Sequence, residues 1–88
     1  INLNPEYKLA YYNLGVAYYK EGNYRESLSF LEKAKKISPQ DSNIYWCFAT
    51  VYEKLGKTAN AEQYLYKAIE LNPSNEILYS ILRSLQTI

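Results

Sequence analysis

The chain has 88 residues, of which 48% are hydrophobic and 22% are charged, so it has room for one folded domain and is not disordered. Ten basic and nine acidic side chains give a net charge of +1, which lacks the basic excess typical of nucleic-acid binding. The sequence has no His, and Cys47 is its one Cys, which excludes an intrachain disulfide and the common His/Cys metal sites. We therefore expect one domain, not an enzyme, with no cofactor and no nucleic-acid partner.

The apolar runs of the chain bear on whether it enters a membrane. No apolar stretch approaches the roughly 20 residues that span a bilayer, and no signal peptide opens the sequence. We expect a soluble, cytoplasmic protein without membrane insertion. Because the chain contains no Met and begins with Ile1, we interpret it as a fragment of a longer protein.

The first two predicted helices form a pair separated by a tight turn. The first covers about residues 7–21, where apolar residues recur at helical spacing. Gly22 is expected to end this helix in the left-handed conformation, and Asn23 to cap the next helix in a capping box with Glu26. The second helix covers about residues 24–37 and carries Glu32 and Lys36 as an exposed i,i+4 pair.

The same plan follows again and then begins a third time. Two further helices are predicted over residues 43–55 and 58–71, with a turn at Gly56. A fifth helix is predicted over residues 75–87. Its apolar stripe is too wide to be covered by one packed side and consists of Ile77, Leu78, Ile81, Leu82, Leu85 and Ile88.

A period of 34 residues organises these elements. This shift superimposes Pro5 on Pro39 and Pro73, and Tyr11 on Tyr45 and Tyr79. It also pairs these residues of the two copies: Tyr18 with Tyr52, Lys20 with Lys54, Gly22 with Gly56, Leu31 with Leu65, Lys33 with Lys67, and Ala34 with Ala68. A fixed period of about 20–50 residues indicates a repeat array, in which each unit buries its apolar face against its neighbours.

On these residues the chain resembles the tetratricopeptide repeat family. The first copy supplies Tyr11, Leu14, Gly15, Tyr18, Ser27, Leu31, Ala34 and Pro39, and the second supplies Tyr45, Phe48, Ala49, Tyr52, Ala61, Leu65, Ala68 and Pro73. The resemblance implies an all-α fold, a right-handed solenoid of antiparallel helix pairs with about two and a half repeats and five helices. Residues 1–7 would be the tail of a preceding repeat, 8–41 and 42–75 two repeats, and 76–88 a third first-type helix or a capping helix.

The resemblance also implies a binding surface. In this family the first helix of each pair, the first-type helix, lines a concave groove, and the second-type helix forms the convex back. The positions that this maps to the groove are Leu9, Tyr12, Asn13, Val16, Tyr19, Asn43, Trp46, Thr50, Ile77 and Ile81, and the wider lining adds Lys20, Cys47, Glu53, Lys54, Ser80 and Ser84. Aromatic and aliphatic groups with a few neutral polar ones suit an apolar peptide or one face of an amphipathic helix. We therefore expect a scaffold or adaptor with a protein or peptide partner.

A second binding mode of the family is not expected here. That mode holds the C-terminal carboxylate of a chaperone with Lys, Asn and Arg at set groove positions. In this chain those positions hold Tyr12, Val16, Cys47, Ile77 and Ile81, and counting from one repeat earlier only Asn13 fits. A buried carboxylate without cationic partners is unfavourable by about several kcal/mol.

Two alternatives stay open at this stage, one about Trp46 and one about the function of the chain. Trp46 is either an aromatic anchor for a ligand or a packing residue between neighbouring first-type helices. Tyr11, Tyr18, Tyr45, Tyr52 and Tyr79 are assigned to the core lattice of the repeat, and Cys47 to a small buried hydrophobic position. The alternative function is self-association through open repeat ends, with a homo-oligomer formed through the C-terminal helix.

Overall fold

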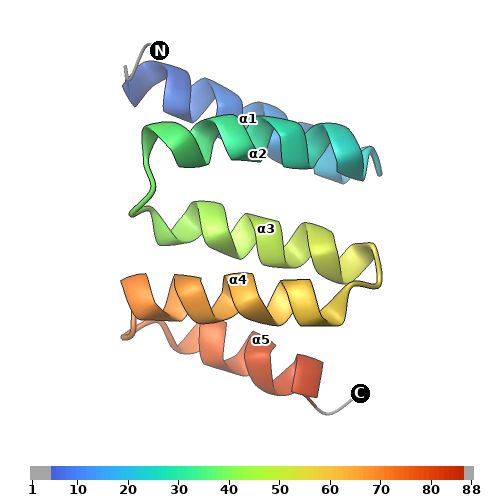
Figure 1. Ribbon diagram of the computed structural model, residues 1–88, viewed down its shortest axis with the longest axis vertical. Helices are drawn as coiled ribbons and strands as arrows, with labels where there is room; N and C mark the ends of the chain where they lie inside the picture. The colour runs from blue at the N-terminus through green and yellow to red at the C-terminus, as the bar shows by residue number, and fades with distance from the viewer. Residues whose placement is uncertain (1–4, 87–88) are drawn as a thin grey trace.

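The computed structural model describes residues 5–86, which form five α-helices and no strand. The helices are α1 (Pro5–Lys20), α2 (Tyr24–Ile37), α3 (Ser42–Lys54), α4 (Thr58–Leu71) and α5 (Glu76–Gln86). They follow one another down the long axis, with α1 at the top of Figure 1 and α5 at the bottom. The predicted all-α solenoid of five helices is confirmed. Within this described part, no helix is long and apolar enough to cross a membrane.

The bounds of α2 and α4 agree with the prediction, and the other three helices differ by a residue or two. α1 is described from Pro5, and the fixed φ of proline suits the first turn of a helix. α3 begins at Ser42, because the carboxylate of Asp41 accepts a hydrogen bond from the backbone N–H of Asn43 at 3.0 Å. The amide oxygen of Asn75 accepts in the same way from the N–H of Ile77 at 3.1 Å, before α5 begins. The predicted end at Thr87 lies outside the described residues.

Both glycine turns have the predicted left-handed backbone. Gly22 has φ +82° and Gly56 has φ +76°. Two backbone hydrogen bonds close the turn after α1, and two close the turn after α3. In the first, the N–H of Asn23 donates to Tyr18 at 2.9 Å and that of Gly22 to Tyr19 at 3.0 Å. The second turn repeats this pattern.

Two predicted side-chain interactions are wrong. The side chain of Asn23 makes no capping bond, and its backbone N–H, which a capping box would give to Glu26, already donates to Tyr18. Glu32 pairs with Lys35 at 3.0 Å instead of Lys36. The Nζ of Lys35 also lies over the rings of Phe48 and Tyr64, at 5.2 and 5.8 Å from the centroids, and this position fixes it beside Glu32.

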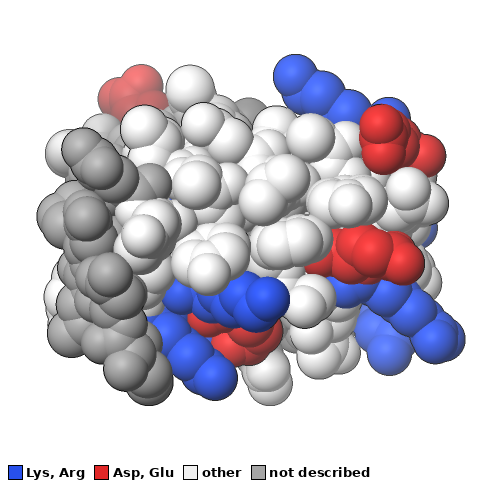
Figure 2. Space-filling view, turned by 90° about the horizontal axis from the view of Figure 1, so that it is seen from above, with Lys and Arg blue, Asp and Glu red and all other residues white. Residues whose placement is uncertain are grey.

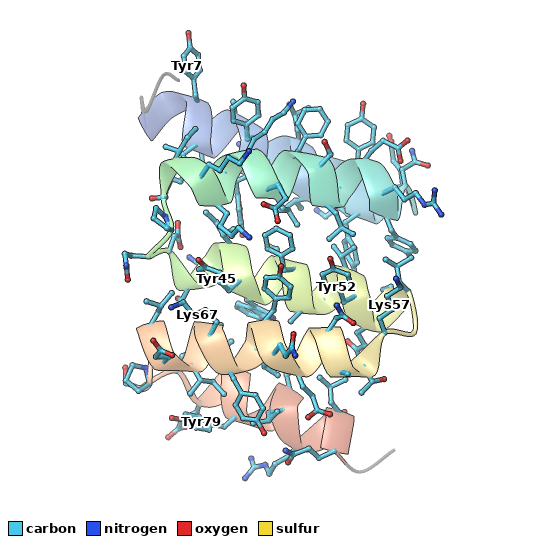
Figure 3. The ribbon with its side chains drawn as sticks, in the orientation of Figure 1. Tyr7, Tyr45, Tyr52, Lys57, Lys67 and Tyr79 are labelled. Carbon is cyan, nitrogen blue, oxygen red and sulfur yellow. The ribbon has the colours of Figure 1, made fainter. Side chains whose placement is uncertain are left out.

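The buried core forms two clusters that share α3. One joins α2 to α3 through Leu31, Ala34, Ile44, Phe48 and Val51, and the other joins α3, α4 and α5. Of the five tyrosines assigned to the core, Tyr45 is buried and three are half-buried. Tyr79 is 40% exposed, which corrects its assignment to the core, because no helix after α5 covers it in the described residues. Figure 3 shows Tyr79 beside α5, and Tyr45 and Tyr52 within the stack.

Candidate functional site

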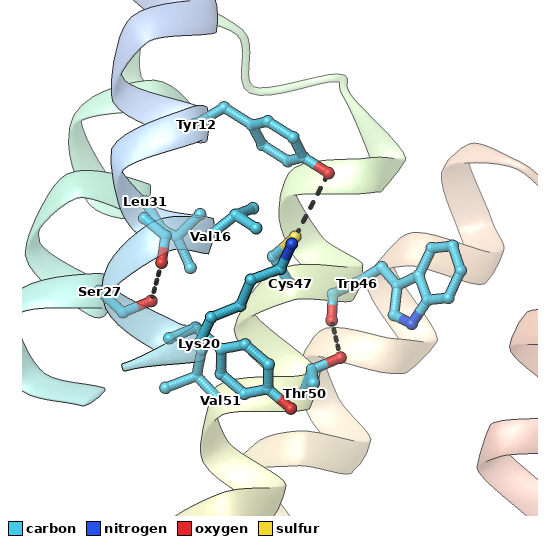
Figure 4. Close-up of a pocket in the computed structure, with 11 residues that line it drawn as sticks. Tyr12, Val16, Lys20, Ser27, Leu31, Trp46, Cys47, Thr50 and Val51 are labelled. Atoms are coloured by element: carbon cyan, nitrogen blue, oxygen red, sulfur yellow. Dashed lines mark hydrogen bonds between the residues drawn. The ribbon is translucent and has the colours of Figure 1, made fainter. Parts of the chain in front are cut away.

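A cavity of about 230 Å³ opens between α1 and α3. Its wall contains five of the residues predicted for the groove, and two more of the wider lining. These are Tyr12, Val16, Tyr19, Trp46 and Thr50, with Lys20 and Cys47. Figure 4 shows Tyr12, Val16 and Lys20 on α1 facing Cys47 and Thr50 on α3, with the ring of Trp46 on the far side of α3. The cavity lies between α1 and α3, the two helices that the family resemblance identifies as first-type helices.

The floor of this pocket comes from a close approach of α1 and α2. A Cβ on Gly15 would lie 2.9 Å from Cγ and Cδ2 of Leu31, so only glycine lets the two helices come this near. The hydroxyl of Ser27 donates to the carbonyl oxygen of Gly15 at 2.6 Å, and Ser27 is fully buried. Leu31 and Val51 complete the floor, each 1% exposed. Tightly packed residues of this kind hold the shape of the pocket.

One side of the pocket joins the two repeats. The thiol of Cys47 donates to the hydroxyl of Tyr12 at 3.5 Å, across a separation of 35 residues. Burial raises the pKa of the Cys47 thiol above its ordinary value. Burial first, and then the bond to Cys47, raises the pKa of Tyr12 well above its ordinary range. Both groups are therefore neutral near pH 7, and this side of the pocket carries no charge.

The surroundings of Trp46 bear on the two alternatives that the sequence left open. It lines the pocket, and it also packs, half-buried, against the cluster that joins α3, α4 and α5. The hydroxyl of Thr50 donates to the carbonyl oxygen of Trp46 at 3.0 Å, so the polar group of Thr50 is paired within its own helix. Figure 4 shows its ring on the side of α3 away from Tyr12, Val16 and Lys20, so Trp46 lies at the edge of the cavity.

The other five predicted groove residues do not reach this pocket. Leu9 is 55% exposed, and Asn13 and Asn43 are also exposed. Ile77 is 56% exposed, whereas Ile81 packs half-buried against the α3–α4–α5 cluster. The structure therefore concentrates half of the predicted site in one cavity and leaves the rest as separate surface positions.

Four pocket residues were not predicted: Gly15, Ser27, Leu31 and Val51. They form the floor, and two of them belong to α2, which the resemblance places on the convex back. The sequence does contain a pattern that could have identified this floor. Gly15 and Ser27 are small residues in the middle of helices, and under the 34-residue shift they align with Ala49 and Ala61, which are also small. Small residues at matching positions of two paired helices indicate a close approach.

The rim of the pocket carries one charged side chain, that of Lys20. Lys20 is exposed at the edge of the pocket and forms no ion pair with another residue of the described part. All other lining groups are uncharged. The site thus offers an apolar cavity with one free cation at its mouth.

Two family models match the chain, and both are described as Tetratricopeptide repeat; they cover residues 9–41 and 42–75. Anaphase-promoting complex subunit 3 of Schizosaccharomyces pombe is 27% identical over 82 residues, which are 93% of this chain and 12% of that protein. The chain therefore spans about an eighth of that relative. A solved structure titled "First TPR of Spaghetti (RPAP3) bound to HSP90 peptide SRMEEVD" has a TM-score of 0.87 and 27% identity, with 93% of this chain and 67% of that one covered.

Proposed function

Since this chain belongs to the tetratricopeptide repeat family, we propose that it is a protein-interaction module whose α1–α3 pocket takes a bulky apolar side chain of a bound peptide. The observation that supports this most directly is the uncharged cavity of about 230 Å³ between two first-type helices. Burying a Leu- or Phe-sized side chain there contributes about 1.5–3 kcal/mol. The ligand is an apolar peptide or one face of an amphipathic helix.

The similar solved structure supports the class of ligand, because it is bound to an HSP90 peptide. The chemistry of the site favours a different contact in this chain. Tyr12, Val16 and Cys47 stand where the chaperone-binding mode needs charged or amide groups, and all three are neutral. The affinity of this pocket therefore comes from apolar burial, with Lys20 adding at most a rim contact.

The remaining predicted residues extend the proposed contact beyond the pocket. Leu9, Asn13, Asn43, Ile77 and Ile81 would meet the flanking residues of a ligand that runs across α1, α3 and α5. The exposure of Leu9, Asn13, Asn43 and Ile77 suits the rim of an interface, where single contacts contribute little. The anchor is expected at Trp46, since buried aromatic groups carry most of the energy of an interface.

The test is a peptide selection followed by substitutions. Peptides selected from a random display library on the immobilised chain are titrated by calorimetry into wild type and Trp46→Ala. The substitution should weaken binding by about 2 kcal/mol or more, which is roughly 30-fold. Tyr66→Ala is the matched control, because Tyr66 is an exposed aromatic residue of α4 outside the pocket.

Helicity measured by circular dichroism should be unchanged in both variants, so that a loss of affinity reports the contact. Val16→Asp is a second pocket variant, and it places a carboxylate against an apolar ligand. Selected peptides that bind Trp46→Ala and Val16→Asp as tightly as wild type would show that the pocket is not the binding site.

A homo-oligomer formed through α5 is the second candidate. Ile77 and Tyr79 of α5 are 56% and 40% exposed, which leaves apolar area at that end of the stack. Light scattering over a range of concentrations tests this proposal, since self-association raises the mean mass as the concentration rises. A constant monomer mass would exclude it.

A further inference from the structure

The donors inside the α1–α3 pocket are already used within the chain. The hydroxyl of Ser27 donates to a backbone carbonyl of α1 at 2.6 Å, and the hydroxyl of Thr50 donates to a carbonyl of its own helix at 3.0 Å. The thiol of Cys47 donates to the hydroxyl of Tyr12 at 3.5 Å. A polar group placed deep in this pocket would therefore find few partners, and such burial is unfavourable. The interior selects an apolar group.

The room in the pocket depends on the small side chain of Cys47. Under the 34-residue shift, Cys47 of α3 corresponds to Ile81 of α5. Ile81 packs half-buried against the cluster that joins α3, α4 and α5, so hydrocarbon fills that position beside α3. Cysteine is smaller than isoleucine, and it leaves this space open beside α1. The residue at position 47 thus contributes to the volume of the cavity.

The size and walls of the pocket favour a ring. A dry apolar cavity of roughly 150 Å³ holds a benzene ring. The α1–α3 pocket has about 230 Å³, so it has room for a phenyl or indole group. A Leu side chain would leave part of this space empty, and voids in packed interfaces are unfavourable. Tyr12 and Tyr19 belong to the wall, and aromatic rings attract one another beyond the area that they bury.

One cation at the mouth of the pocket is available to a ligand. Lys20 is the last residue of α1, and it is exposed while it lines the pocket. Figure 4 shows its side chain extending from the side of α1 towards α3. Glu21 follows it in the chain and Glu53 lies in the last turn of α3; both are exposed, and neither pairs with Lys20 in the described part. A ligand carboxylate can therefore pair with this ammonium.

Charge elsewhere on the molecule does not produce the same attraction. Figure 2 views the molecule from the end formed by α1 and α2, and it shows Lys and Arg side chains lying close to Asp and Glu side chains. The visible charges among the described residues are thus mixed in sign and form no broad basic area on this face. Any preference for an acidic ligand must come from a single side chain, so one substitution should reverse it.

We propose that the partner segment carries an aromatic residue that fills the α1–α3 pocket and, within one helical turn of it, an acidic residue that pairs with Lys20. This inference rests on the proposed function and names the class of peptide for that same site. The acidic residue lies close in sequence because Lys20 borders the cavity itself. Burial of the ring supplies most of the affinity, and the ion pair at the rim supplies specificity.

The test of the ring uses short synthetic peptides in a Gly/Ser background. Both ends are blocked, so that side chains carry the only charges. The central residue is Trp, Phe, Leu or Ala, and one Asp is moved through each position within a helical turn of it. Amide chemical shifts of the isotope-labelled 88-residue chain measure binding, because they resolve weak affinities. The Trp or Phe peptide should bind about threefold more tightly than the Leu peptide or better, and the Ala peptide most weakly.

The test of the charge replaces Asp by Lys at the best position of the peptide. Wild type should bind the Lys peptide about fivefold more weakly at low salt, and the difference should shrink at high salt. In Lys20→Glu the order of the two peptides should reverse. Lys36→Glu is the matched control, because Lys36 is exposed on α2 outside the pocket and its substitution changes the net charge equally. This control should keep the preference for Asp.

Two variants that fill the pocket locate the ring. Cys47→Ile places at position 47 the residue that α5 has at the corresponding position. Val16→Phe fills the cavity from α1 and leaves the bond between Cys47 and Tyr12 intact. Each should weaken the Trp peptide about tenfold or more, with helicity by circular dichroism unchanged. If one variant does not fold, the other carries the test.

The outcomes separate this inference from the proposed function. It is overturned by a Leu peptide that binds as tightly as the Trp and Phe peptides, by equal affinity for the Asp and Lys peptides, or by a preference for Asp that persists in Lys20→Glu. It is also overturned if none of these peptides binds while peptides selected from the library do. Each of these results leaves the pocket as a site for apolar side chains. Unchanged binding in both filled variants would contradict the proposed function as well.

Discussion

The two helical hairpins of this chain have different small residues at the point where their helices meet. In α1–α2 the contact point combines Gly15 with Ser27, whose hydroxyl donates to the Gly15 carbonyl at 2.6 Å. In α3–α4 the corresponding residues are Ala49 and Ala61, which are 2% and 0% exposed. The second hairpin thus accommodates a Cβ at the position where the first has no room for one. Only the hairpin with glycine contributes this contact point to the pocket.

The largest expected effect comes from filling the glycine contact. Gly15→Val should lower the free energy of unfolding by about 2–3 kcal/mol, because its Cβ would meet Leu31 at 2.9 Å and Leu31 is too buried to move aside. Ala49→Gly in the other hairpin should cost only about 1 kcal/mol, from lost helix propensity. Urea denaturation measures both. Equal losses would show that the two contact points are equally tight.

The turns should respond alike in the two hairpins. Gly22→Ala and Gly56→Ala should each lower the free energy of unfolding by about 1–2 kcal/mol, since both glycines have positive φ. No atom lies within 4 Å of either added Cβ, so the backbone conformation alone sets the effect. Thermal melts followed by circular dichroism provide the comparison. A substitution without effect in one turn would mean that this turn relaxes to a negative φ.

The smallest effect is expected for the substitution that makes the two contact points more alike. Ser27→Ala should cost about 0.5–1.5 kcal/mol, the net value of one buried hydrogen bond, because the donor leaves together with its hydroxyl. The variant then has the same small residue as Ala61 in the second hairpin. Denaturant melts of Ser27→Ala and of Ala61→Gly, as a control at the matching position, test this. A neutral Ser27→Ala would indicate that the bond offsets only the burial of the hydroxyl.

The helices could be predicted because local signals agree with the period. Gly22 and Gly56 stand at turns that need a left-handed residue, and the bounds of α2 and α4 were found to the residue. The predicted capping box does not form, because the backbone N–H of Asn23 donates to the carbonyl oxygen of Tyr18 and closes the turn. Such competition between two local motifs depends on the path of the backbone, which residue types alone do not determine.

The site was harder to predict than the fold. Helical spacing indicates the direction of Tyr12, Val16 and Trp46, and these residues do meet in one cavity. Spacing does not indicate how near the next helix comes, so Leu9 and Asn13 share that assignment but lie exposed. The floor depends on the distance from Gly15 to Leu31 across two helices. That distance depends on how α1 and α2 pack, which the spacing of residues along the sequence does not determine.

The position of Trp46 also allows ligand binding to be followed by the intrinsic fluorescence of the chain. It is the one tryptophan among 11 tyrosines, and it borders the cavity. Excitation at the red edge of the absorption band, where tyrosine does not absorb, would report on this indole alone. Emission should shift to shorter wavelength when an apolar group displaces water beside it, so occupancy can be followed without a label.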